Sequence, residues 1–153
     1  MFERVLVATD GSESVRRAID VGLDVAERFD ADLHAVTVLD TSELDATPEA
    51  LREEYRAALE SQAETSLDSF ERQIPDEPVS TAIREGRPAA EIRAHADQIG
   101  ADLIVAGTRG RHGEHRQLLG SVAEHLVRNS SVPVLTVRQL AAKEDVSGET
   151  ATR

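Results

Sequence analysis

A glycine-rich segment at residues 107–121 contains the residue types best suited to chemistry in this chain. It has four glycines within fourteen positions, follows an apolar run at 103–106 and leads directly into a helical pattern. Glycine allows main-chain N–H groups to approach a ligand closely, and the first amides of a helix have no intrahelical partner. The segment is therefore predicted to bind an anion, because a helix N-terminus stabilises a phosphate through its dipole and its unpaired donors.

The predicted phosphate ligands are three main-chain positions and one hydroxyl: Gly107, Gly110, Gly120 and Ser121. Their spacing differs from that of a P-loop, which requires a lysine directly after its last glycine, whereas the single lysine of this chain is Lys143. Positive charge would come instead from arginines of the segment, beginning with Arg109. A flexible connection is the alternative interpretation of such a segment, so the surrounding elements decide between the two.

Short apolar runs alternate with segments of helical periodicity along the whole chain. Continuous apolar runs of four to six residues are typical of strands buried on both faces of a parallel sheet. Strands are predicted at 4–9, 33–39, 79–83, 102–106 and 132–137. Helices are predicted to follow the N-cap residues Ser12 and Thr47, and to begin at Pro88 and at Val122. Gly100 is expected to end the third of these helices.

This β-α-β-α-β-α-β-α-β alternation predicts a three-layer open α/β sandwich around a five-stranded parallel sheet. In such sheets ligands bind beyond the carboxyl ends of the strands, where the winding reverses. Asp10, Val38 and Gly107 each lie at or near the end of a predicted strand, so they are expected to converge on one crevice. Asp10 is suited to accept hydrogen bonds from ribose hydroxyls. Its alternative role is to cap the first helix, for which Ser12 offers a better cap.

The stretches VLVATDGS, ADLIVAGTRG with LLGSVAEHLV, and VPVLTV resemble the universal stress protein family in its ATP-binding branch. The resemblance covers residues 2–138, which implies one domain at 1–138 with a fold similar to that of adenine nucleotide alpha hydrolases. It implies a base contact at Val38, a ribose contact at Asp10 with Ala8 and Thr9 beside it, and phosphate contacts at the glycine-rich segment. Thr37 stands where the family commonly has histidine. The resemblance also implies a homodimer in which the fifth strand pairs with its twin.

Composition excludes several other classes of function. The chain has no cysteine, which excludes disulfides, thiolate metal sites and a cysteine nucleophile. A net charge of −12 argues against a nucleic-acid partner.

No apolar run is long enough for a signal peptide or a membrane span, so a soluble, cytoplasmic protein is expected. The excess of acid and the scarcity of lysine suggest adaptation to high salt. Residues 139–153 lack periodicity and are expected to form a disordered tail.

Two functions remain open at this point. The first is an ATP-binding stress-response or signalling module, and the second is an ATPase or nucleotide-dependent transferase on the same scaffold. No nucleophile–base pair stands out, so no catalytic residue is assigned, and the missing lysine favours binding with slow or no hydrolysis. No metal site is assigned either. His112 and His115 are interpreted as solvated loop residues, and Mg²⁺ is expected only together with the nucleotide phosphates.

Overall fold

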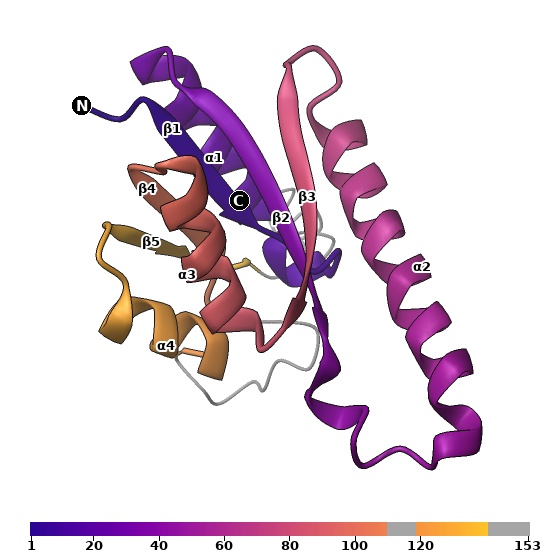
Figure 1. The fold of residues 1–153 in the computed structure, drawn as a ribbon. Coiled ribbons are helices and arrows are strands. Elements are labelled where there is room, and N and C mark those ends of the chain that lie inside the picture. The colour runs from indigo at the N-terminus through magenta and orange to yellow at the C-terminus, as the bar shows by residue number, and fades with distance from the viewer. Residues whose placement is uncertain (110–118, 141–153) are drawn as a thin grey trace, which may run out of the picture.

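The computed structural model describes residues 1–109 and 119–140 and contains one five-stranded sheet within these ranges (Figure 1). The strands are β1 (Arg4–Ala8), β2 (Asp32–Asp40), β3 (Val79–Gly86), β4 (Leu103–Gly107) and β5 (Val134–Val137). The α-helices are α1 (Arg16–Phe29), α2 (Glu49–Gln73), α3 (Pro88–Ile99) and α4 (Ser121–Asn129). Two short 3-10 helices, η1 (Glu13–Val15) and η2 (Thr41–Glu43), precede α1 and α2.

The strand order is β3-β2-β1-β4-β5, and every neighbouring pair is parallel. The chain builds outward from β1 through β2 to β3, and then returns past β1 to form β4 and β5. The winding therefore reverses between β1 and β4, whose carboxyl ends are neighbours in the sheet. The predicted fold class is confirmed, and the reversal of winding lies between the strands that precede Asp10 and Thr108.

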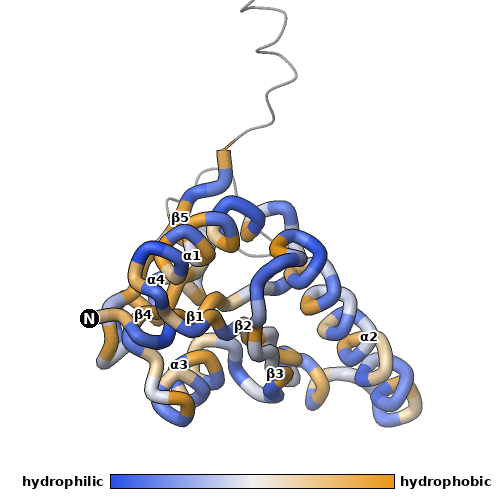
Figure 2. The backbone as a smooth tube through the Cα atoms, turned by 90° about the horizontal axis from the view of Figure 1, so that it is seen from above, coloured by the Kyte–Doolittle hydropathy of each residue, from blue (hydrophilic) through white to orange (hydrophobic). Residues whose placement is uncertain are grey.

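Two apolar cores cover the two faces of the sheet. On one face Val5, Val7 and Val105 pack against α1 and the C-terminal half of α2, where Phe70 is fully buried. On the other face Leu6 and Ile104 pack against α3 and α4. Figure 1 shows α3 and α4 in front of the sheet with α1 behind it, and Figure 2 shows α1 and α3 on opposite sides. Alternate residues of each strand supply the two cores, which explains the continuous apolar runs.

The element bounds differ from the predicted ones mainly at strand ends. β3 continues through Arg84 to Gly86, beyond the predicted end at residue 83, because β2 runs to Asp40 and pairs with it along that length. α2 begins at Glu49 with Pro48 as its N-cap, one residue later than expected. Gly100 ends α3 in the left-handed conformation, φ +68°, as predicted. Phe29, the last residue of α1, is 48% exposed and packs edge-to-face on Phe2 at 5.0 Å between ring centroids.

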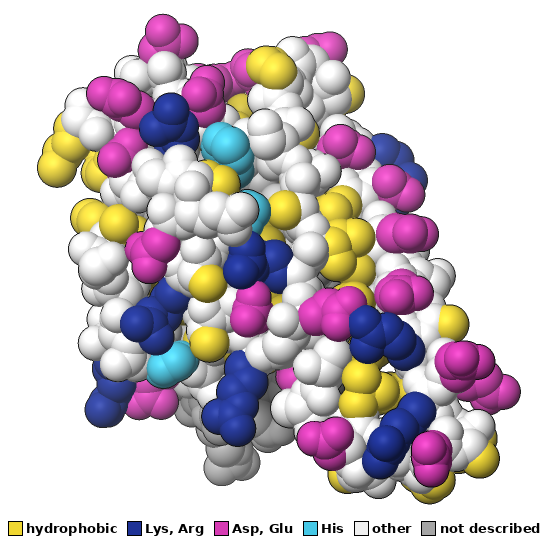
Figure 3. Space-filling model, viewed as in Figure 1, with side chains coloured by type: hydrophobic (Ala, Val, Ile, Leu, Met, Phe, Trp, Pro, Cys, Tyr) yellow, Lys and Arg dark blue, Asp and Glu magenta, His cyan; other side chains and the backbone are white. Residues whose placement is uncertain are grey.

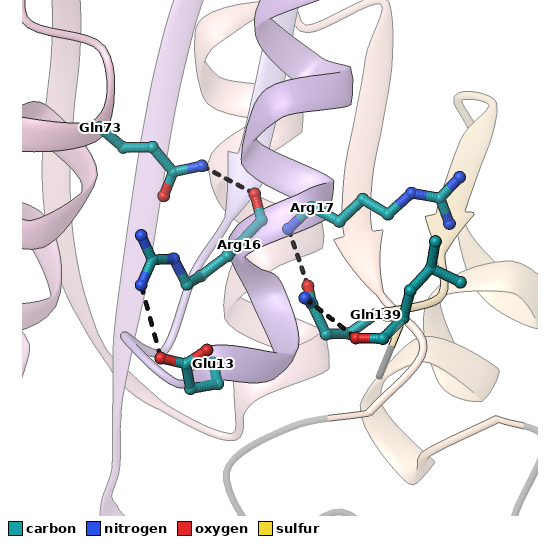
Figure 4. Close-up of polar contacts among 6 residues, drawn as sticks. Glu13, Arg16, Arg17, Gln73 and Gln139 are labelled. Carbon is teal, nitrogen blue, oxygen red and sulfur yellow. Dashed lines mark hydrogen bonds and ion pairs between the residues drawn. The ribbon is translucent and has the colours of Figure 1, made fainter. Parts of the chain in front are cut away.

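Side chains from two distant segments hold the start of α1 (Figure 4). The Gln73 amide of α2 donates to the Arg16 carbonyl oxygen at 2.8 Å and to Asp20. The Arg17 backbone N–H donates to Oε1 of Gln139 at 2.9 Å. Gln139, expected to begin a disordered tail, therefore caps α1. Residues 141–153 lie outside the described residues, and none of the described helices is long and apolar enough to cross a membrane.

Candidate functional site

A tight turn after β1 positions the predicted ribose ligand, Asp10. Oδ1 of Asp10 accepts a hydrogen bond from the Ser12 backbone N–H at 2.9 Å, and Oγ1 of Thr9 accepts one from Gly11 at 3.1 Å. Gly11 has φ +78°, and a Cβ at this position would lie 2.5 Å from Oγ of Ser66 in α2. Only glycine fits this turn, because both the backbone conformation and the close contact with α2 exclude a side chain. The Asp10 carboxylate is thus fixed at the carboxyl end of β1.

Ser12 does not make the capping bond that was expected of it. It occupies the N-cap position of η1, but its side chain makes no cap hydrogen bond, and its buried Oγ has no partner among the described residues. Instead, the Asp10 carboxylate accepts the hydrogen bond of a backbone N–H in this turn, that of Ser12. The prediction that Ser12 is the better cap is therefore wrong, because the turn geometry turns the aspartate oxygen toward the amide.

The backbone of Val38 in β2 lies just beyond the point where the neighbouring strand β1 ends. Thr9 donates to the Val36 carbonyl oxygen at 3.0 Å, so Val36 directs its backbone groups toward β1. Backbone groups alternate in direction along a strand, hence those of Val38 also point to the β1 side. The last register pair between the strands is Ala8 with Val36, so β1 has ended before it reaches Val38. One N–H and one C=O of Val38 therefore face the crevice.

The end of β4 and the start of α4 are joined by a backbone hydrogen bond. Gly120 N–H donates to the Thr108 carbonyl oxygen, and Thr108 N–H donates to Val137 of β5 at 3.1 Å. Gly120 is the N-cap of α4 and has no side chain, so it contributes no side-chain cap to the first turn. Because the Gly120 N–H already donates to Thr108, it is not available as a donor to a phosphate at the predicted site. The donors that remain are the amides of the first turn, from Ser121 onward, with the exposed Ser121 hydroxyl.

Gly107 makes the contact that brings the β1 and β4 ends together. A Cβ at Gly107 would lie 3.0 Å from the Ser14 carbonyl oxygen and 3.3 Å from that of Arg109. The loop after β1 therefore packs directly on the end of β4, and a glycine allows this close approach. Arg109 is partly buried near the same place, and Ala8 contributes to the α3-side core. Gly110, His112 and His115 lie outside the described residues.

Those predicted site residues that the structure describes lie at the carboxyl edge of the sheet, at or beside the reversal of winding. The loop after Asp10 packs on Gly107 through Ser14, and Gly120 is bonded to Thr108, the residue after Gly107. Val38 lies two residues beyond the end of the β1–β2 pairing. This edge offers a carboxylate, a strand backbone with an N–H and a C=O, and a helix N-terminus. Among the residues that the structure describes, no three His, Cys, Asp or Glu side chains are placed to hold a metal ion.

A polar network between β3 and α3 was not predicted from the sequence. Arg84 of β3 donates to Glu91 at 2.9 Å and to Gln98 at 2.7 Å, and its Nη1 lies 3.4 Å from Nδ1 of His95. His95 is only 8% exposed. Burial and the neighbouring cations Arg84 and His34 lower the pKa of His95 below its usual value. The signal in the sequence was Arg84 itself, a charged residue directly after the predicted strand at 79–83.

A hollow of about 620 Å³ lies at the opposite edge of the sheet. The amino-terminal ends of the first three strands line it, together with the C-terminal end of α1. The ionisable side chains that line it include both bases and acids: Arg4, His34, Glu27, Asp30 and Asp32. A smaller hollow of about 290 Å³ runs along α4 from Ser121 past Glu124 and His125 to Arg128. The second hollow begins at the helix end that belongs to the candidate site.

Comparison with known proteins supports the family resemblance. The family model described as the universal stress protein family matches residues 1–138. A universal stress protein of Methanocaldococcus jannaschii is 34% identical over 142 residues, which cover 91% of this chain and 84% of that protein. The universal stress protein UspA from Lactobacillus plantarum superposes with a TM-score of 0.80 at 26% identity, covering 90% and 98% of the two chains.

A further solved structure is that of a universal stress protein in complex with cAMP. It has a TM-score of 0.62 at 26% identity and covers 91% of this chain and 99% of its own. The family model spans nearly all of the described residues, and the sequence relative and the solved structures agree with it. The chain belongs to the universal stress protein family.

Proposed function

We propose that the chain binds an adenine nucleotide, ATP with Mg²⁺ carried on its phosphates, at the carboxyl edge of the sheet. The nucleotide-bound form would act as a stress-response signal in the cytoplasm. The base would lie against Val38, the ribose against Asp10 with Ala8 and Thr9 beside it, and the phosphates along Gly107, Arg109, Gly110, Gly120 and Ser121. The solved relative in complex with cAMP supports this ligand class, since cAMP is itself an adenine nucleotide.

The backbone of Val38 is the observation that carries the proposal. One N–H and one C=O face the crevice from the same residue. Adenine presents the matching pair on its Watson–Crick edge, where the N6 amine donates and N1 accepts. Guanine and hypoxanthine present the reverse, a carbonyl that accepts and an N1–H that donates. With the ribose held at Asp10, the direction of the base along β2 is fixed, so the order of the Val38 N–H and C=O favours adenine without using any side chain.

Isothermal titration calorimetry with ATP and with inosine triphosphate tests this assignment. The two ligands share ribose and triphosphate, so a difference in affinity reports on the base alone. ATP is expected to bind about tenfold or more tightly, because the base edge of inosine triphosphate, held by the same ribose contact, faces donor to donor and acceptor to acceptor with Val38. Equal affinities would contradict the role given to Val38.

The Asp10→Asn variant tests the ribose contact separately from the fold. Asparagine retains an Oδ1 that accepts from Ser12 N–H, so the turn is expected to persist. Loss of the charge should weaken ATP binding by about 1.5–3 kcal/mol, while the melting temperature changes little. Asp10→Ala is the matched control, because it removes both the charge and the turn bond. Equal losses of stability and affinity in Asp10→Asn would assign the carboxylate to folding alone.

A true ATPase on the same scaffold is the second candidate. Phosphoryl transfer by P-loop enzymes uses a lysine at the β- and γ-phosphates and a residue that orients water, and Lys143 is the only lysine here. We therefore expect stoichiometric ATP retention with turnover far below about 10 per second. A steady-state phosphate-release assay with magnesium decides between the two functions, since rapid turnover would identify an enzyme.

A further inference from the structure

The outer edge of β3 has main-chain groups that no neighbouring strand uses in the described part of the chain. Thr37 of β2 is in register with Ile83 and, by the alternation that turns Val36 toward β1, directs its own groups toward β3. It therefore pairs with the groups of Ala82 and Arg84. The backbone N–H and C=O groups of Thr81, Ile83 and Glu85 consequently point outward, away from the sheet.

This edge lacks three of the features that commonly protect an edge strand, namely short length, proline and lysine. It is eight residues long and contains no proline and no lysine. Thr81, Ile83 and Glu85 are all exposed, with Ile83 at 42%. Natural sheets commonly shield such edges with short strands, lysines or prolines. An exposed apolar side chain between two outward-facing backbone groups suits a segment that adds to the sheet as a further strand.

The flank of α2 next to this edge is acidic. Four glutamates recur at spacings that place them on one side of the helix: Glu53, Glu60, Glu64 and Glu71. Arg56 contacts Glu85 of β3 and lies 3.7 Å from Glu60, which shows that this side of α2 faces β3. The opposite side faces α1, since Gln73 bonds Arg16 there. Figure 3 shows apolar side chains beside β3, bordered by a column of carboxylates along α2.

We propose that the β3 edge binds an extended, basic segment of a partner protein as a sixth strand. Main-chain pairing with Thr81, Ile83 and Glu85 would supply register, and Ile83 would contact an apolar side chain of the segment. Lysines or arginines at alternate positions would lie toward the four α2 glutamates. The surface lies at the opposite end of the strand order from β5, and the proposal is independent of the nucleotide site.

A fluorescein-labelled octapeptide, Lys-Val-Lys-Thr-Lys-Val-Lys-Thr, serves as the probe for fluorescence anisotropy with the full chain. The peptide is expected to bind, and its affinity is expected to fall with rising salt. A fully N-methylated peptide of the same charge is expected to bind at least about tenfold more weakly, because it cannot pair with the strand edge. Equal binding of the two peptides would show charge attraction alone and overturn the proposal.

Two variants of α2 with the same change in net charge locate the peptide. Glu60→Gln/Glu71→Gln removes charge beside β3, and Glu54→Gln/Asp68→Asn removes it from the solvent side of the same helix. The first pair is expected to weaken binding about fivefold and the second less than about twofold. Similar losses for both pairs would contradict the assigned surface.

Amide hydrogen exchange identifies the edge directly. Addition of the peptide is expected to protect the amides of Thr81, Ile83 and Glu85, while those of Ala82 and Arg84 already pair with β2. Absence of peptide binding, or binding without this protection, would overturn the proposal. Protection that instead increases with protein concentration in the absence of peptide would assign the edge to a second copy of the chain and also refute it.

Discussion

At the scale of single residues, the glycines of the candidate site serve different physical purposes. Gly11 is required by its positive φ and by its contact with Ser66, and Gly107 by its approach to the Ser14 carbonyl oxygen. Gly120 has φ −72° and ψ 167°, an extended conformation that any residue adopts. Its backbone N–H bonds Thr108, and a side chain does not remove that bond. Neither the backbone conformation nor this hydrogen bond requires glycine at 120, whereas the proposed approach of a phosphate would require it.

Gly120→Val is therefore expected to separate binding from stability. We predict loss of ATP binding, because the side chain would project where phosphates meet the first turn of α4. The free energy of unfolding should change by less than about 1 kcal/mol, as for exposed substitutions without strain. Calorimetric titration and urea unfolding measure the two effects. Gly107→Ala is the contrasting variant, expected to lose stability because its Cβ would crowd the Ser14 oxygen. Undiminished ATP affinity in Gly120→Val would refute the phosphate position.

At the scale of elements, Gly22, the glycine of α1, allows the close approach of this helix to β1. A Cβ at Gly22 would lie 2.6 Å from Cγ2 of Val7 in β1. Gly22→Ala should gain up to about 1 kcal/mol in helix propensity, but the overlap is expected to cost about 1–3 kcal/mol and to dominate. The Val7→Ala/Gly22→Ala double variant relieves the overlap. In the Val7→Ala background, urea unfolding should show that Gly22→Ala leaves the free energy of unfolding unchanged or raises it. Losses that add in the double variant would exclude this packing explanation.

The order of the elements and the convergence of the site were predictable from the sequence, whereas the contacts within the site were not. Alternating apolar runs and helical periods determine a parallel sheet, and its topology brings the residues after β1 and β4 together. The bond from Gly120 to Thr108 and the contact of Gly11 with Ser66 join residues far apart in sequence, so no local pattern reports them. The predicted strand at 79–83 ended too early because Arg84 is charged. In the structure Glu91 and Gln98 of α3 accept hydrogen bonds from Arg84, so the strand continues through it.

The packing of α3 on β3 predicts a stability that depends on pH. His95 faces Arg84 of β3 and His34 of β2, and its pKa is lowered chiefly by burial. Burial likewise lowers the pKa of His34, although Asp32 opposes the shift. The folded state therefore disfavours the protonated imidazoles relative to the unfolded chain, whose histidines titrate near pH 6.5. Their contribution to stability is complete above that pH and is lost as the pH falls toward and through the folded pKa values.

Urea midpoints at pH 7.5 and at pH 5.5 measure this effect. The midpoint is expected to fall on acidification, and the fall should be smaller in His95→Gln. His125→Gln on α4 is the control for removal of a histidine from a surface helix. A fall of the same size in His95→Gln and in the parent chain would show that other groups determine the acid sensitivity.

At the scale of the whole molecule, we expect a homodimer formed through β5, with an affinity set by charge. The Ile104 N–H bonds the Pro133 oxygen and the Thr108 N–H bonds Val137, so the alternate residues Val134 and Thr136 direct their backbone groups outward. Leu135 is 36% exposed beside them. Two outward residues related by a twofold axis can pair with their copies in a second chain. Each copy carries a net charge of −12, so the two repel each other at low ionic strength.

Light scattering in molar potassium chloride should therefore give twice the mass of 16.6 kDa, with dissociation as the salt is diluted and screening is lost. Thr136→Pro is the decisive variant, because it removes an outward N–H that β4 does not use and should yield a folded monomer. Leu135→Pro is its matched control, since it removes an N–H directed toward β4 and should lower the melting temperature. A 16.6 kDa species at micromolar concentration in strong salt, or a dimer that survives Thr136→Pro, would exclude pairing through β5.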